Sequence, residues 1–396
     1  MGSLVPSSTE PFSDGAVFGI FTGWKSIYEK IRRSFNDLNV VIVGAGPIGL
    51  SSAILALQTG RVSKLVIFEE RQRKELVNLS YQISFDENSV NFLQSSKIDF
   101  DNIEGCWHEG CFSTRVGVYL EYIFDRLQAY RNSTVLFNTK FDRDKCKEID
   151  NLPGRLLVLT CDGRNGQAGR ILGLNDFSQQ HSCGAYGAIA AVDRTEQRDV
   201  PTPEKRMHNL TFDLSAYGTY CTDNDGFPGF SLKIFGNSKH RFISLAIARC
   251  DSPVVKTLRT ILDRSMMRNI FLKCFNQYKV ESEPAISDSY ALHHMKFSPR
   301  LFEIKLSQRC ETVAYFDDCD TFVLAEGEAA MSFNFHTGLD INPAIRGLMS
   351  LSTFIEMISI AETEHSITEA LIYKMKHTDS VCKELIKHGM KEYMFS

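Results

Sequence analysis

The sequence predicts an α/β protein with a Rossmann-like parallel-sheet domain, an inserted antiparallel-sheet domain and C-terminal helices. Three observations predict it. The stretch VVIVGAGPIGLSSAILALQTG, residues 40–60, runs from an apolar strand through a glycine-rich turn into a helix. Residues 180–300 alternate short β-patterns with turns rich in Gly, Asn and Asp. Residues 361–396 show helical spacing with mixed charge.

The composition is that of an ordinary globular protein with room for a large core. The chain has 396 residues, 43% hydrophobic and 23% charged, and a net charge of −4, so no basic field attracts nucleic acid. The 11 cysteines show neither C-x-x-C pairs nor zinc-finger spacing, which favours free thiols and no metal site. With no recognisable signal peptide, we expect a cytoplasmic protein.

The first 38 residues form an N-terminal extension in this interpretation. Apolar residues recur there every three to four positions from Ile20 to Ile31, which predicts an amphipathic helix. The apolar run is too short for a membrane span. We favour a helix that packs on the body of the protein over one that contacts a membrane surface.

The first element of the expected fold is a strand and turn typical of dinucleotide binding. Val40–Val43 is a continuous apolar run, as in buried parallel strands. In the G-x-G-x-x-G pattern the first glycine permits a tight turn, the second lets a pyrophosphate approach, and the third packs helix on strand. The N–H groups at the start of the helix would face the phosphates. The turn comprises Gly44, Gly46, Pro47, Ile48 and Gly49.

A second strand supports this interpretation. The stretch KLVIFEE, residues 64–70, carries Glu69 near its end, twenty residues after Gly49, with Glu70 and Arg71 next to it. An acidic residue at this place accepts hydrogen bonds from the ribose of an adenine dinucleotide. The two motifs together predict that the chain binds such a nucleotide.

Three later stretches extend the pattern. Residues 156–174 contain an apolar strand followed by Asp162-Gly163. Residues 320–348 contain another, followed by Gly327-Glu328, a loop at 338–342, and a helix expected from Pro343 to about Ile360. The stretch CFSTRVGVYLEYIFDRLQAY places Arg115 at the start of an amphipathic helix, where a guanidinium suits a diphosphate.

These motifs, in this order, resemble those of the FAD-dependent aromatic hydroxylases, the class A flavoprotein monooxygenases with the p-hydroxybenzoate hydroxylase fold. That family carries G-x-G-x-x-G, Asp-Gly and Gly-Asp motifs in the same order, and the resemblance covers residues 39 to about 360. It implies an FAD-binding domain of residues 39–180 and 295–360, a substrate domain of residues 181–294 with an antiparallel sheet, and a helical tail of residues 361–396. Aromatic residues of the substrate domain, such as Phe235 and Phe242, are candidates to line an apolar cavity, with ordinary core packing as the alternative.

The resemblance also implies a reaction. FAD would be reduced by NADPH or NADH and would then react with O2, and a C4a-hydroperoxyflavin would hydroxylate a small organic substrate. The sequence has no second G-x-G-x-x-G for a separate NADPH domain, in agreement with this class. Two alternatives remain open: a flavin oxidase or dehydrogenase, and a catalytically impaired flavin-fold protein that acts through binding partners.

The resemblance assigns the cofactor contacts residue by residue. Arg115 would lie near the pyrophosphate or ribityl chain, Asp162 near the pyrophosphate, and Glu328 near the ribityl or pyrophosphate region. The loop at 338–342 would pass the flavin ring, and the helix after it would stabilise negative charge on the reduced ring. The expected FAD-binding residues are Gly44, Gly46, Pro47, Ile48, Gly49, Glu69, Glu70, Arg71, Arg115, Asp162, Gly327, Glu328, Gly338, Leu339, Asp340, Ile341 and Asn342.

The sequence departs from the family pattern at the flavin loop. Glu328 stands where relatives carry aspartate, and Asp340 where they often carry a second glycine. A carboxylate at 340 would either repel an anionic ring or turn away from it. No catalytic residue can be assigned from these motifs. His336, which would lie close to the ring, is the one candidate, with a structural role as the alternative.

Overall fold

The computed structural model describes residues 38–149, 152, 154–194, 204–210, 230–236, 239–248, 253–281 and 283–388. The expected N-terminal helix lies outside these residues. Within them, no helix has the length and apolar character that crossing a membrane requires. The cysteines of the described part of the chain are all free thiols.

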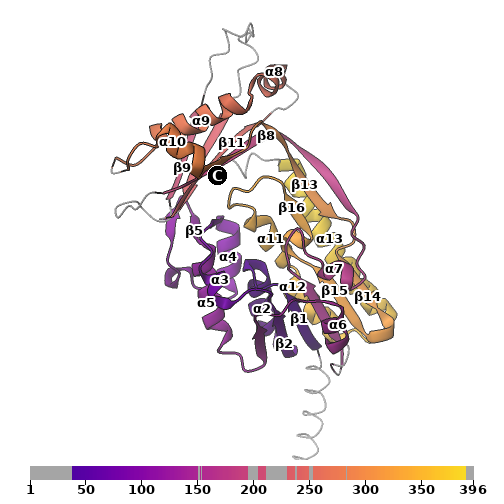
Figure 1. Ribbon diagram of the computed structural model, residues 1–396. Helices are drawn as coiled ribbons and strands as arrows, with labels where there is room; N and C mark the ends of the chain where they lie inside the picture. The colour runs from indigo at the N-terminus through magenta and orange to yellow at the C-terminus, as the bar shows by residue number, and fades with distance from the viewer. Residues whose placement is uncertain are drawn as a thin grey trace, which may run out of the picture.

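A mainly parallel sheet forms the base of the molecule, in the order β14-β15-β7-β1-β2-β6 (Figure 1). The β14–β15 pair is antiparallel and the other pairs of this sheet are parallel. The central strands read as continuous apolar runs because helices cover both faces of the sheet. The strands are β1 (Leu38–Val43), β2 (Val62–Phe68), β6 (Ser133–Leu136), β7 (Leu156–Thr160), β14 (Val313–Phe316) and β15 (Thr321–Ala325).

The helices sort onto the two faces by the alternation of side chains along each strand. On β1, Val40 and Ile42 pack under the larger group of helices, while Val41 and Val43 face the smaller one. The first group comprises α2 (Pro47–Gln58), α5 (Val116–Leu127), α11 (Ile341–Leu348) and α12 (Leu351–Ile360). The second comprises α6 (Arg143–Ile149) and α7 (Ala168–Ile171).

A second sheet is antiparallel, in the order β16-β13-β8-β11-β10-β9, with β12 also paired to β8. Three helices cover one face and bury a separate core with it (Figure 1). Its strands are β8 (Ser178–Asp193), β9 (Glu204–Leu210), β10 (Phe230–Gly236), β11 (His240–Ala248), β12 (Met295–Phe297), β13 (Phe302–Arg309) and β16 (Met331–Phe333). The helices are α8 (Pro253–Ile261), α9 (Arg264–Gln277) and α10 (Asp288–His294).

The antiparallel sheet extends past the stretch 181–294 from which we expected it. Strand β8 begins at Ser178, and β12, β13 and β16 all come after residue 294. The reason is that β8 is 16 residues long and pairs with β11 and β12 along one part and with β13 along the other. The long strand β8 therefore extends the antiparallel sheet to strands on both sides of the expected boundary.

A small third sheet, in the order β3-β5-β4, lies next to α5. Its β3–β5 register places Gln82 opposite Arg115, and the hydroxyls of Ser84 and Ser113 form a buried hydrogen bond of 2.7 Å across the pair. The elements here are α3 (Arg73–Val77), β3 (Gln82–Phe85), α4 (Glu87–Ser95), η1 (Phe100–Asn102), β4 (Cys106–His108) and β5 (Cys111–Arg115).

The prediction of a single helix from Pro343 to about Ile360 is wrong. It is broken into α11 and α12, with Met349 and Ser350 between them. The carbonyl of Gly347, near the end of α11, accepts hydrogen bonds from the Ser350 hydroxyl at 3.2 Å and from the Lys374 ammonium at 3.0 Å. These partners satisfy a carbonyl that the helix would otherwise leave unpaired at its end.

The C-terminal helix α13 (Glu364–His388) is tied into this break by a buried charge pair. Lys374 is fully buried, and its Nζ lies 2.5 Å from Oε1 of Glu326, whose side chain is 4% exposed. Glu326 follows β15 directly and precedes the Gly327-Glu328 turn. The tail helix thus anchors the backbone next to one of the expected cofactor motifs.

Removing the Lys374 charge should therefore destabilise the fold. Lys374→Met leaves the Glu326 carboxylate buried without its partner, which costs about 3–5 kcal/mol of unfolding free energy. The measurement is urea unfolding at pH 7. Lys376→Met, two residues along on the exposed face of α13, is the matched control and should change stability by less than about 0.5 kcal/mol. Equal effects of the two substitutions would contradict the role given to the buried pair.

Candidate functional site

The glycine turn between β1 and α2 is formed by close backbone approach. Gly44 has a φ of +99°, and a Cβ there would lie 2.6 Å from the carbonyl oxygen of Cys161. A Cβ at Gly49 would lie 1.9 Å from the Gly44 carbonyl oxygen. Only glycine fits these two positions, because any side chain would displace backbone.

Gly46 differs from its two neighbours in the motif. A Cβ at Gly46 would meet no protein atom within 4 Å, and Gly46 is the N-cap of α2, directly before Pro47, the first residue of the helix. The first N–H groups of a helix lack intrahelical partners. The open space at Gly46 therefore lies where backbone donors and the positive end of the helix are available to an anion.

Glu69 is buried at the end of β2 and holds this turn in place. Its Oε2 accepts a hydrogen bond of 2.8 Å from the backbone N–H of Ala45, and its Oε1 accepts one of 2.9 Å from the backbone N–H of Arg71. Each carboxylate oxygen retains further acceptor capacity. Glu70 and Arg71 follow on the exposed surface.

Arg115 ends β5 and precedes α5, as expected from its motif. Its side chain is partly buried, and within the described chain the guanidinium makes no hydrogen bond or ion pair. A guanidinium without a protein partner is available to a phosphate or carboxylate ligand.

Asp162 lies beside the glycine turn, but its carboxylate serves its own loop. A Cβ at Gly44 would lie 3.1 Å from the Asp162 Cα, so the two loops touch. The carboxylate accepts a 2.9 Å hydrogen bond from the N–H of Ala168, and a Cβ at Gly166 would overlap it at 2.1 Å. Burial raises the pKa of Asp162, against the lowering effect of the Ala168 hydrogen bond.

The Gly327-Glu328 turn, η4 (Gly327–Ala329), packs against the first turn of α2. Gly327 has a φ of +65°, and a Cβ there would lie 3.1 Å from the side chain of Ile48. Glu328 in turn lies near the Asp162 loop, because a Cβ at Gly163 would be 3.9 Å from its Oε2. The three loops that follow β1, β7 and β15 are therefore in contact.

The loop at 338–342 is fixed by contacts to β3. Gly338 has a φ of +78°, and its carbonyl accepts a hydrogen bond of 2.8 Å from the N–H of Ser84. The buried amide of Asn342 donates to the Ser84 carbonyl at 3.0 Å and accepts from the Asp86 N–H at 3.0 Å. Asn342 is thus a structural clamp, and the side chains of Leu339 and Ile341 belong to the core.

A cavity of about 660 Å³ lies between this loop, β3 and the antiparallel sheet. The sheet contributes apolar side chains, among them Phe235 and Phe242, whose rings stack at a centroid distance of 5.3 Å. Ile83 of β3 adds a further apolar side chain, and the other lining side chains are polar. They are Tyr81, Gln82, Lys296, Ser298, Glu328, His336 and Asp340.

Three of these side chains form a charged cluster. Nδ1 of His336 lies 3.4 Å from Oδ2 of Asp340 and 3.9 Å from Oε1 of Glu328. The second carboxylate oxygen of Asp340 accepts a 3.3 Å hydrogen bond from the N–H of Thr337. The Asp340 carboxylate therefore points to His336, one residue before the start of α11.

The three groups shift one another's pKa values. The hydrogen bond to Asp340 raises the pKa of His336 and outweighs its partial burial. Burial disfavours the ionised form of Asp340, but the hydrogen bond and charge of His336 more than offset it, and the pKa of Asp340 is lowered. Burial, followed by the charge of Asp340, raises the pKa of Glu328.

Ligand atoms of Glu328, His336 and Asp340 all lie within 4.8 Å of one another, a spacing that a divalent ion would accept. The raised pKa of His336 favours a proton on the imidazole beside these carboxylates, and that positive charge would compete with a cation. We therefore assign no metal to the cluster.

Sequence reasoning missed Lys233, on β10. Its side chain is buried, and Nζ donates a hydrogen bond of 3.2 Å to the carbonyl of Thr337 in the loop before Asp340. Burial, aided by the charge of Lys205, lowers its pKa to about 7. The one indication in the sequence was a lysine in the mostly apolar strand FSLKIFG. Its partner Thr337 is 104 residues away, so the sequence could not predict the contact.

Gln82 is a second residue that the motifs did not indicate. Its Oε1 accepts a 2.9 Å hydrogen bond from the N–H of Gly236, which joins β3 to β10 beside the cavity. Its Nε2 is buried without a partner in the described chain. The loop at 337–340 is thus held from one side by β3 and from the other by β10.

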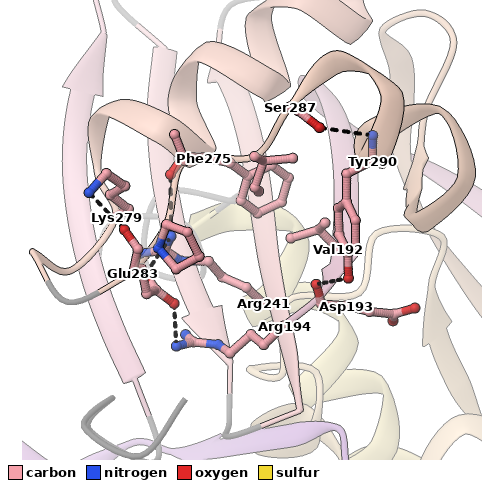
Figure 2. A pocket seen from close by; sticks show the side chains of 12 residues that line it. Val192, Asp193, Arg194, Arg241, Phe275, Lys279, Glu283, Ser287 and Tyr290 are labelled. Atoms are coloured by element: carbon pink, nitrogen blue, oxygen red, sulfur yellow. Dashed lines mark hydrogen bonds and ion pairs between the residues drawn. The ribbon is translucent and has the colours of Figure 1, made fainter. Parts of the chain in front are cut away.

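A smaller cavity of about 200 Å³ lies between α9, α10 and the outer end of the antiparallel sheet (Figure 2). Glu283 joins Arg194 at 2.7 Å and Arg241 at 3.0 Å, and all three side chains are buried. Arg241 also donates to the Phe275 carbonyl at 3.2 Å. The network connects helix to sheet, and none of the expected cofactor residues lines it.

Comparison with known proteins identifies the fold. No protein-family model and no curated protein sequence matches the chain. The structure of p-nitrophenol 4-monooxygenase PnpA from Pseudomonas putida DLL-E4 is similar, with 14% identity, a TM-score of 0.50, and coverage of 91% of this chain and 90% of that one. So is that of CtdE in complex with FAD and substrate 4, with 14% identity, a TM-score of 0.50, and coverage of 89% and 88%. The expected p-hydroxybenzoate hydroxylase fold is thereby confirmed.

Lys233 should give the fold a distinctive pH dependence. Its pKa is near 7 in the folded protein, against 10.5 for a lysine in water, so between these values the unfolded chain binds a proton that the folded chain lacks. Stability contributed by this group therefore rises with pH. From pH 7 to pH 9 the wild type should gain about 2–3 kcal/mol relative to Lys233→Met, measured by urea unfolding.

The difference in unfolding free energy between the two proteins removes the contribution of the other groups that titrate in this range. Lys256→Met, on the exposed side of α8, is the control, and it should reproduce the wild-type change between the two pH values. If Lys233→Met also reproduces it, the assignment of a near-neutral buried lysine is wrong.

Proposed function

We propose that this protein binds FAD and is a flavin-dependent monooxygenase that acts on a small organic compound. NADPH or NADH is the proposed electron donor and O2 the oxidant. The observation that carries the proposal is the convergence of the loops after β1, β7 and β15 at one sheet edge, beside a cavity large enough for a ring system. The likeness to PnpA and to CtdE, whose structure contains FAD, supports it.

The chain's own residues fit the cofactor. The start of α2 offers open space at Gly46 and unpaired N–H groups for a pyrophosphate. Arg115, which has no partner among the described residues, would add a second anchor for that group. Glu69 keeps acceptor capacity for a ribose hydroxyl while it holds the glycine turn through Ala45. The cavity lined by the 338–340 segment would take the ring.

FAD, when bound, supplies the electron transfer and the reaction with oxygen, and the protein supplies placement and a dry environment. The backbone of the 337–340 segment is held by Ser84 and Lys233, so the wall against which a ring would rest is rigid. The apolar side chains of Phe235 and Phe242 exclude water from the sheet side of the cavity. This environment favours an apolar, planar substrate.

The test of the cofactor is a substitution that leaves the fold intact. In Gly46→Val the new Cβ meets no protein atom within 4 Å, but the side chain occupies the room for the pyrophosphate. We expect the purified wild type to bind FAD, with bands near roughly 375 and 450 nm that bleach on addition of NADPH. Gly46→Val should bind FAD at least about 100-fold more weakly, with a melting temperature lowered only by the loss of a favourable N-cap residue.

The matched comparison is Gly49→Ala, whose Cβ would overlap the Gly44 carbonyl, so it should lower the melting temperature. A wild-type protein that stays colourless and takes up no FAD would refute the proposal. NADPH consumption that yields only hydrogen peroxide with every organic compound tried would instead favour a flavin oxidase.

A further inference from the structure

His336 is placed to exchange a proton with whatever binds in the 660 Å³ cavity. It lines that cavity, and its side chain is 53% exposed. Both carboxylates that contact it approach Nδ1, and carboxylate oxygens only accept hydrogen bonds. Nδ1 therefore carries a hydrogen, and Nε2, which has no partner in the described chain, is the nitrogen left for a ligand.

The carboxylate of Asp340 determines this arrangement. One oxygen contacts His336 and the other accepts from the N–H of Thr337, so the side chain cannot turn to solvent without losing both partners. Glu328 adds a second negative group at 3.9 Å. A carboxylate that holds the far nitrogen of an imidazole fixes its tautomer and stabilises its protonated form.

We propose that His336, held through Nδ1 by Asp340 and Glu328, exchanges a proton at Nε2 with the reactants in the cavity, and that Asp340 is its positioning residue. The proposal rests on the proposed function. It explains the carboxylate at 340, which the family pattern alone leaves as a disadvantage for an anionic ring.

The proton balance shows where such a residue acts. When NADPH is oxidised by O2 without substrate, NADPH, H⁺ and O2 give NADP⁺ and H2O2, so one proton enters from solution. Imidazolium Nε2–H releases its proton to the reduced oxygen that leaves as H2O2, and the neutral imidazole regains one proton from solution at its exposed side. The neighbouring titratable and charged groups that also face this cluster are Tyr81, Arg164 and Lys233, with Lys296 on the same cavity wall.

The first test needs no cofactor. The pKa of His336 is measured by NMR titration of histidine Cε1–H signals, with His336→Gln to identify its signal. We expect a pKa above 6.5 in the wild type and a lower value in Asp340→Asn, whose amide oxygen can still accept from Thr337. The matched control is Asp193→Asn, because Asp193 contacts His240 at 3.0 Å away from the cavity, and it should leave the His336 signal unchanged. An unaltered His336 pKa in Asp340→Asn overturns the proposal.

The second test uses the FAD-loaded protein and follows NADPH-driven hydrogen peroxide release from pH 5.5 to 9. His336→Gln should lower the rate about 100-fold and remove the inflection in the profile. Asp340→Asn should move that inflection to lower pH, in parallel with the NMR titration. A profile that is identical in His336→Gln overturns the proposal. A protein that takes up no FAD refutes the proposed function, and the NMR titration then still decides whether the pair exists.

Discussion

The pairing of β7 between β1 and β15 is the constraint on which the candidate site depends. The register sets Val43 opposite Thr160, and Thr160 opposite Ala325, so all three strands end at the same edge. The loops that follow are therefore in contact, although they come from distant parts of the sequence. Carboxyl ends of parallel strands are where α/β folds bind nucleotides, and the glycine turn adds the helix start that an anion requires.

Everything else in the site is support for these loops. Glu69 binds the glycine turn next to the end of β2. The hydrogen bond between Asn342 and Ser84 fixes the 338–342 loop on β3, and Lys233 on β10 binds the carbonyl of Thr337 just before it. The helical tail takes part through Lys374, which neutralises Glu326 just before the Gly327 turn. Because so many elements fix these loops, the charged groups beside the cavity are preorganised.

The sequence was sufficient for the features that depend on local pattern. Four predicted features lie at one sheet edge: the strand–glycine–helix motif, the acidic residue after β2, the Asp-Gly turn and the Gly-Glu turn. Short motifs predict such features because they depend on the backbone conformation of a few consecutive residues. The reach of the antiparallel sheet beyond residue 294 was not predictable, since strand pairing depends on partners far along the chain. The helix break at Met349 and Ser350 was missed for the same reason: the group that satisfies Gly347 comes from Lys374.

Charge placement was the least predictable part of the site. The sequence left open whether Asp340 faces a ring or turns outward, and in the structure Asp340 lines the cavity and contacts His336 there. The roles of Lys233 and Gln82 were not predicted. A single polar residue in a short strand indicates no function until its hydrogen-bond partner is known. Burial then decides their properties, and burial is a result of the whole fold.

The most direct measurement of the central claim is hydrogen–deuterium exchange of the protein with and without FAD. The account predicts slower exchange in three separate stretches together, residues 44–50, 162–168 and 327–342, and at the start of α5 next to Arg115. Protection confined to one of these stretches, or located around Arg194 and Glu283 in the smaller cavity, would contradict the claim that the three loops form a single cofactor site.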